Sequence, residues 1–130
     1  MINDKDRMER TPIYYAAQKG QAACLKFLLT QTFRRKGDVE AQAADSSTAL
    51  TIAARNGHFE CVQLLCQKGK ANVEAVTNKG LRAIHCAALS GSIKICKYLI
   101  ETGECDVNAV DSYNRTAFYI ACQEKVSKAR

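Results

Sequence analysis

Cysteine and histidine are the residues of this chain most able to do chemistry, and seven cysteines and two histidines occur among its 130 residues. His85 and Cys86 are the one adjacent pair of the two types. A catalytic thiol needs a base within hydrogen-bonding reach. Neighbouring residues on a helix point about 100° apart and do not face each other. The pattern therefore favours a structural role for His85 over nucleophilic catalysis.

Metal and cofactor chemistry finds no better support. Cys61 and Cys66 would lie roughly 140° apart around a helix, so that one ion could not readily take both thiolates. No Cys-x-x-Cys pair occurs, nor do the P-loop, the dinucleotide-binding glycine motif, or the zinc-protease and serine-hydrolase signatures. We expect no catalytic residue, no metal, no cofactor and no enzymatic activity. Cysteines distant in sequence that converge in space remain an alternative.

The cysteines belong to a longer pattern, an internal repeat. The stretch from Thr48 to Cys66 has counterparts whose leading residues are at positions 11, 48, 82 and 116, so the separations are 37, 34 and 34. An alanine follows five residues after each leading position, and a glycine follows nine residues after it in the first three copies. A period in the thirties indicates a solenoid of stacked helical units.

Each copy predicts an inner helix, and three copies predict an outer helix as well. The inner helices are expected at roughly Pro12 to Gln18, Ala49 to Arg55, Ala83 to Leu89 and Ala117 to Gln123, and the outer helices at roughly Ala22 to Gln31, Phe59 to Gln67 and Ile93 to Glu101. Threonines 11, 48 and 116 can cap the inner helices. Arg82 cannot, which predicts a helix start that is weaker by about 1 kcal/mol. The helical cysteines replace Ile, Val, Leu or Ala, which predicts buried thiols in a reducing compartment.

The phrases that carry the period resemble a known family. TPIYYAAQKG, TALTIAARNGH, RAIHCAALSG and TAFYIACQEK are similar to the helix opening of ankyrin repeats, and GDVEA, GKANVEA and GECDVNA are similar to the family's repeat ending. The resemblance covers roughly Asp6 to Cys122. It implies an all-helical ankyrin-type solenoid whose repeats are joined by β-hairpin or loop fingers. It also implies that His85 makes a structural hydrogen bond within its turn.

We expect one domain over residues 1–130, with repeats at roughly 6–41, 42–75 and 76–109 and a partial repeat at 110–130. The fourth copy has no outer helix rich in large apolar residues. Either the segment QEKVSKAR continues the inner helix, or the chain is a piece of a longer array, which we favour. Extra residues at Thr32 to Lys36 predict that the first connection is the most mobile loop.

Charge and hydropathy restrict the location and the partners. The formal net charge is +6, with one dense basic run at Arg34 to Lys36. No apolar run approaches the ~20 residues that cross a bilayer. The polar start MINDKDRMER lacks the apolar core of a secretion signal. We expect a cytoplasmic protein whose main partner is neither a nucleic acid nor a membrane.

A stacked-repeat surface suits recognition, and the resemblance implies a concave groove built from inner helices and fingers that binds another protein. Leu81, Leu89 and Tyr113 are candidate anchors at positions expected to face solvent. The resemblance places the contact positions on the fingers and inner helices, and the predicted partner-binding residues are Met8, Arg10, Lys19, Asp45, Arg55, Asn56, Lys79, Leu81, Leu89, Tyr113 and Arg115. The protein is expected to be a monomer, or to make end-to-end contacts through its incomplete terminal repeat. Two alternatives stay open: binding of an anionic polymer or membrane through the basic residues, and a thiol-dependent enzyme or redox sensor.

Overall fold

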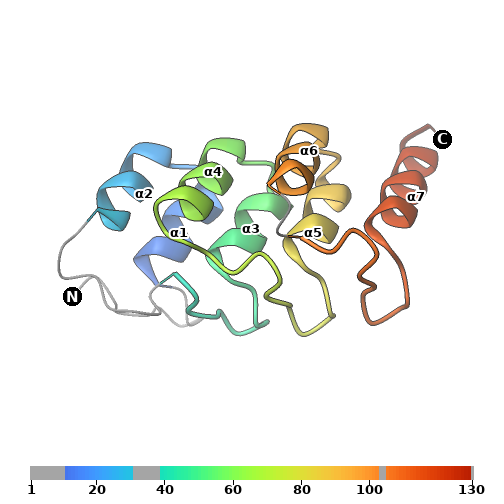
Figure 1. Cartoon of the computed structure of the whole chain (residues 1–130), viewed down its shortest axis with the longest axis horizontal. Helices are drawn as coiled ribbons and strands as arrows, with labels where there is room; N and C mark the ends of the chain where they lie inside the picture. The colour runs from blue at the N-terminus through green and yellow to red at the C-terminus, as the bar shows by residue number, and fades with distance from the viewer. Residues whose placement is uncertain (1–10, 31–38, 103–104, 130) are drawn as a thin grey trace.

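A computed structural model of the chain describes residues 11–30, 39–102 and 105–129, which form two rows of helices (Figure 1). The inner row is α1 (Pro12–Lys19), α3 (Ala49–Arg55), α5 (Ala83–Ser90) and α7 (Ala117–Ala129). The outer row is α2 (Ala22–Leu29), α4 (Phe59–Gln67) and α6 (Ile93–Glu101). Helices pack most closely on the next helix of the same row and on the other helix of their own repeat. This is the predicted all-helical solenoid.

The inner helices begin as their leading residues predict. Thr11 accepts a hydrogen bond from the backbone N–H of Tyr14, and Thr48 and Thr51 form a reciprocal capping box. Thr116 accepts one from the backbone N–H of Tyr119. The Arg82 side chain makes no cap hydrogen bond, but the His85 ring accepts the Arg82 backbone N–H, so α5 keeps one of the two bonds of a capping box.

The core is a strip shared by neighbouring repeats. On the inner row the paired alanines are almost wholly buried, which lets successive helices approach closely. On the outer row the largest buried side chains are Leu25, Leu65, Ile95 and Leu99, all fully inaccessible to solvent. Each contributes about 1.5–3 kcal/mol relative to an exposed side chain. The outer helices therefore supply much of the apolar stabilisation, as the sequence indicates.

Three fingers join the repeats, and within the described residues they are tight turns without assigned strands. Each closes in the same way: Ala43, Thr77 and Asp111 donate their backbone N–H to the carbonyls of residues 47, 81 and 115. The residues at the turn, Ser46, Gly80 and Asn114, all have a left-handed backbone with φ of 67°, 74° and 64°. The expected hairpin fingers are thus present as hydrogen-bonded turns.

Gly80 gives a test of how closely two fingers approach. A Cβ at this position would come within 2.8 Å of the Ser112 backbone nitrogen, whereas a Cβ at Gly57, where φ is 75°, would meet nothing within 4 Å. Replacing either glycine with alanine strains the left-handed backbone by roughly 1–2 kcal/mol. We expect Gly80→Ala to destabilise the protein more than Gly57→Ala, as measured by urea unfolding. Equal losses would contradict the close finger-to-finger contact.

The predicted helix bounds agree with the structure in most places, and α7 is the main exception. The sequence pattern ends the last inner helix at Gln123, but α7 continues to Ala129. Lys125 stands where the earlier repeats have glycine, so no left-handed residue stops the helix. The end of α2 was predicted at Gln31, yet the helix ends at Leu29. The segment Thr32 to Lys36, predicted to be a mobile loop, lies outside the described residues.

Candidate interaction surface

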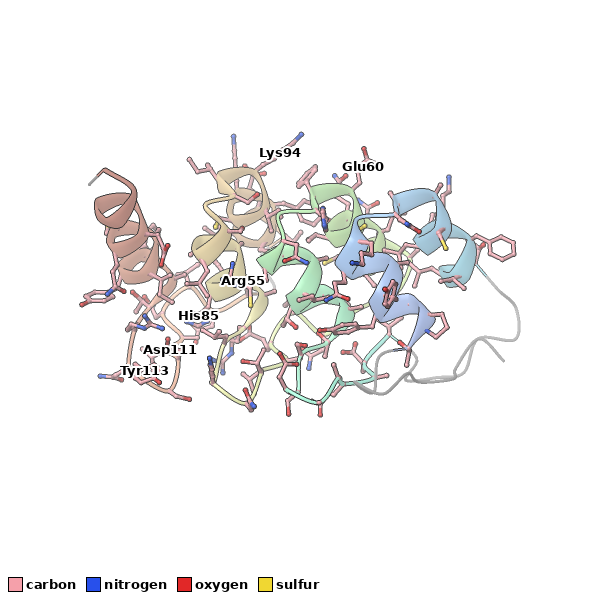
Figure 2. All side chains as sticks on the ribbon, turned by 180° about the vertical axis from the view of Figure 1, so that it is seen from behind. Arg55, Glu60, His85, Lys94, Asp111 and Tyr113 are labelled. Atoms are coloured by element: carbon pink, nitrogen blue, oxygen red, sulfur yellow. The ribbon has the colours of Figure 1, made fainter. Side chains whose placement is uncertain are left out.

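The inner helices and finger tips carry exposed polar and aromatic side chains on one side of the solenoid, which we call the inner face. Figure 2 shows Arg55 on an inner helix and Tyr113 on a finger, while Glu60 and Lys94 lie on the outer helices. Six of the predicted partner-binding residues are exposed on inner helices, at their ends or on finger tips: Lys19, Asp45, Arg55, Asn56, Lys79 and Tyr113. Met8 and Arg10, also predicted, lie outside the described residues.

The finger tips form a row of three side chains held at the repeat spacing. Asp45, Lys79 and Tyr113 each precede the left-handed residue of their finger, and all three are exposed. The backbone N–H of Asn78 donates to the Asp45 carbonyl, and that of Ser112 donates to the Lys79 carbonyl, each with a donor–acceptor distance of 3.0 Å. Because backbone bonds tie each finger to the next, the three side chains start from a fixed array.

Asp111 organises the third finger tip. Its Oδ1 accepts the backbone N–H groups of Tyr113 and Arg115 at 2.9 Å, and its Oδ2 lies 2.7 Å from Arg115 Nη2. Burial of this side chain raises its pKa, but the Arg115 guanidinium and the backbone donors outweigh that effect and hold the pKa below the ordinary value. The Arg115 guanidinium also lies over the Tyr113 ring, 5.3 Å from its centroid, and its Nη1 donates a hydrogen bond to Gln123 Oε1. Its role is to position the finger.

Sequence reasoning missed Asp111, although a signal for it is present. The carboxylate lies two residues before Tyr113 and four before Arg115. Asp two residues before a turn residue is typical of an Asx-turn, in which the side chain accepts a nearby backbone N–H. The Asp45 carboxylate accepts the Ser47 N–H in the first finger by the same spacing.

Two of the predicted residues are not placed as the sequence indicates, and a third makes a contact between repeats. Leu81 and Leu89 were expected to face solvent, but both are half-buried and pack against the core. Asn56 is exposed, but its amide donates to the Gln18 carbonyl of the preceding repeat at 3.0 Å. Ser90, at the equivalent position, donates to the Ala54 carbonyl. This position therefore ties one inner helix to the next.

His85 has the structural role that its context predicts. Its side chain is wholly buried; Nδ1 accepts the backbone N–H of Arg82 at 3.1 Å, and Nε2 lies 3.0 Å from the Ala109 carbonyl. A carbonyl only accepts, so Nε2 carries the proton and the ring is neutral. Burial lowers the pKa of His85, and the Ala109 and Asp111 interactions offset this only in part. The His85 ring is not positioned to act as a base for Cys86, because both of its nitrogens are hydrogen-bonded to backbone groups.

The cysteines divide by position, and the prediction of general burial is wrong for two of them. Cys61 and Cys86 are buried, and burial raises the pKa of Cys86 to about 12. Burial also raises the pKa of Cys96 and of Cys105, which are half-buried. Cys24 and Cys122 are exposed because no described helix packs over α2 on one end of the stack or over α7 on the other. None of the raised pKa values suits an activated thiol.

The part of the chain that the structure describes offers no site for a metal and no span of a membrane. No group of three or more His, Cys, Asp or Glu side chains is gathered to hold an ion there. No described helix combines the length and the apolar character that crossing a bilayer requires. The basic run at Arg34 to Lys36, the basis of the anionic-polymer alternative, lies outside the described residues.

Comparison with known proteins agrees with the repeat geometry. A family model described as ankyrin repeats matches in three copies, over residues 1–77, 31–111 and 70–129. Over 57 residues the chain is 39% identical to ankyrin repeat domain-containing protein 29 of Danio rerio, a match that spans 44% of this chain and 18% of that protein. Ankyrin repeats are generally protein–protein interaction modules. Given the matching period, helix pairs and fingers, this chain belongs to the ankyrin repeat family.

Proposed function

We propose that this chain is a non-enzymatic interaction module that binds a partner protein across its inner face. The observation that carries the proposal is the row of exposed finger-tip side chains at Asp45, Lys79 and Tyr113, fixed by backbone bonds between fingers. A surface that is ordered before binding loses little conformational freedom when a partner docks. Tyrosine and arginine are common at binding hot spots, so Tyr113 and Arg55 are the proposed anchors.

The charge of the inner face indicates the character of the partner. Lys19, Arg55 and Lys79 are exposed cations, and Asp45 is the exposed acid beside them. Arg115 is already paired with Asp111. Among these described residues the exposed cations outnumber the exposed acid, and Tyr113 adds an exposed aromatic ring on the third finger. This arrangement favours a partner segment that carries acidic residues and an apolar group for Tyr113.

A triple variant tests the inner face: Arg55→Ser, Lys79→Ser and Tyr113→Ser. All three side chains are exposed, so the fold is expected to be retained, and circular dichroism checks this. Loss of the anchors is expected to weaken partner binding at least roughly tenfold, equivalent to about 1.4 kcal/mol. Leu81 and Leu89 are left unchanged because they pack on the core.

The matched control carries three exposed changes on the outer side, Glu60→Ser, Gln67→Ser and Lys68→Ser. Both variants and the unaltered protein are used to capture proteins from a cell extract, with quantitative mass spectrometry as the readout. Proteins that bind the inner face should be lost from the triple variant and retained by the control. If the two variants lose the same proteins, or neither loses any, the proposed face is wrong.

A further inference from the structure

The finger tips repeat one position at a fixed interval, and this interval restricts what can bind across them. Asp45, Lys79 and Tyr113 follow one another at 34 residues in sequence, on fingers that stand side by side in Figure 1. The same backbone hydrogen bond joins each finger to the next, with a donor–acceptor distance of 3.0 Å in both cases. The two steps between tips are therefore equivalent, and each corresponds to the step between neighbouring repeats.

The exposure of the tips does not depend on where the chain ends. A further repeat follows Asp45 and Lys79, and both side chains are nevertheless exposed. Neither of them forms an ion pair with another described residue. Tyr113, at the same position of the third finger, is 71% exposed, and the Arg115 guanidinium holds its ring from one side. All three tips are thus available to a bound chain.

The repeat step selects among the regular conformations of a bound chain. Packed helices have axes about 8–10 Å apart, and the buried paired alanines let the inner helices approach closely. A polyproline II chain rises about 3.1 Å per residue with three residues per turn, so every third side chain returns to one face after about 9.3 Å. A β-strand returns side chains to one face after about 6.7 Å and about 13 Å, which do not match this step. The polyproline II period matches the tips.

An α-helix is the remaining alternative, because every seventh residue returns to nearly the same face after about 10.5 Å. A bound helix, however, is held through an apolar stripe that lies in an apolar groove. Two of the three tips, Asp45 and Lys79, carry charges. The tip row therefore suits an extended chain that presents one side chain to each finger.

We propose that the inner face binds a polyproline II segment of a partner protein, which lies across the three finger tips with one turn per repeat. This rests on the proposed function and specifies the segment. A basic side chain pairs with Asp45, an acidic side chain three residues away pairs with Lys79, and a proline or aliphatic side chain three residues farther packs on the open side of the Tyr113 ring. The two opposite charges determine the register of the segment and its order along the solenoid. Aromatic side chains commonly receive proline in polyproline II recognition.

A displayed library of random peptides tests the proposal without a ligand chosen in advance. Peptides of about 12 residues are long enough, since the three contacts span about seven positions. Phage selection on the 130-residue protein is expected to enrich sequences with a basic and an acidic residue three apart and a proline or aliphatic residue three beyond the acidic one. Enrichment of no common sequence, or of the spacings typical of a strand or a helix, would overturn the proposal.

Lys79→Glu tests which tip binds the acidic residue. The Lys79 side chain is exposed, and the bond from Ser112 uses the Lys79 backbone carbonyl, so the fold should survive. This variant is expected to select a basic residue in place of the acidic one. Lys68→Glu makes the same charge change on the outer side and should select the original sequences. The proposal fails if Lys79→Glu leaves the selection unchanged or if Lys68→Glu alters it in the same way.

Fluorescence anisotropy with one selected peptide gives the size of the effect. Lys79→Glu is expected to weaken binding at least roughly tenfold, and a peptide with lysine in place of its acidic residue should restore it. Deleting one residue between the basic and acidic positions should weaken binding to the unaltered protein to a similar extent, because the contacts then miss the repeat step. Full binding by the shortened peptide would overturn the proposal.

Failure here is distinguishable from failure of the proposed function. If the triple variant loses proteins from the extract while the library yields no three-residue spacing, the inner face binds a folded surface of its partner, and the polyproline II proposal alone is wrong. If the triple variant loses no protein either, both proposals are wrong.

Discussion

Replacing His85 with alanine is expected to lower the free energy of unfolding by about 2–5 kcal/mol. The ring is wholly buried. It joins the start of α5 to the chain just before the third finger, through hydrogen bonds with the Arg82 N–H and the Ala109 carbonyl. Truncation leaves both backbone groups without this partner and opens a cavity beside them. Urea unfolding followed by circular dichroism measures the loss.

His58 is the matched control for this change. It is half-buried, and its Nε2 lies 3.1 Å from the Gln18 carbonyl. His58→Ala removes one partly solvated hydrogen bond and should cost only about 1 kcal/mol. If the two variants are equally stable, His85 does not have the structural role assigned to it.

The same histidine gives the protein a pH dependence of known sign. Burial lowers the pKa of His85 in the folded chain, so below its ordinary value of 6.5 the unfolded chain binds a proton that the folded chain does not. Stability should therefore fall as the pH drops from about 6.5 toward the folded pKa, and it should be fully present above 6.5. His85→Ala should remove this contribution to the slope.

Replacing Asp111 with alanine is expected to cost about 2–3 kcal/mol and to weaken partner binding at the same time. The change leaves two backbone N–H groups unpaired and frees the Arg115 guanidinium that stacks on Tyr113. Its side chain is 0% exposed, whereas that of Arg115 is 27% exposed, so water can compensate only one side of the ion pair. Unfolding in urea gives the stability, and hydrogen exchange at Tyr113 reports the finger.

Asp45→Ala, in the first finger, is the control. Asp45 accepts the Ser47 backbone N–H by the same spacing and also the Ser47 hydroxyl, but its side chain is exposed. We expect a loss of about 0.5–1.5 kcal/mol, because water can replace this acceptor. The folded pKa of Asp111 lies below its ordinary value of 3.8, so its contribution to stability persists above that pH and disappears as the pH falls through the folded pKa. A loss at Asp111 no larger than at Asp45 would count against the assigned network.

Much of the fold follows from the sequence because its signals are local. Threonine caps and the returning glycines determine where inner helices begin and turn, and the bounds of α3, α4 and α6 are the predicted ones. The predicted end of α7 at Gln123 was too early, whereas the alternative that QEKVSKAR continues the helix holds as far as Ala129, because no glycine stops the helix where the earlier repeats have one. A repeat period predicts what is shared among copies and cannot predict where one copy departs from them.

The candidate site was only partly accessible to sequence reasoning, because exposure depends on neighbouring repeats. Leu81 occupies the position of Ser47 and Arg115, which are buried and half-buried, so its long apolar side chain packs inward on the core. A charged residue such as Arg115 is expected to be exposed and free to bind a partner. In the structure, however, its guanidinium forms an ion pair with Asp111. Phe118 shows the reverse: Ile13, Leu50 and Ile84 at the same position of the earlier repeats are 1–3% exposed, whereas Phe118 is 66% exposed because no described outer helix follows α7.

Site-specific photo-crosslinking tests the inner face most directly. A photoreactive phenylalanine analogue is placed singly at position 79 or 113 on the inner face, or at position 60 or 68 on the outer side, and each protein is irradiated in cell extract. We predict that one protein is crosslinked from both 79 and 113 and from neither 60 nor 68. A partner crosslinked as strongly from the outer positions, or from neither inner position, would contradict the proposed interaction surface.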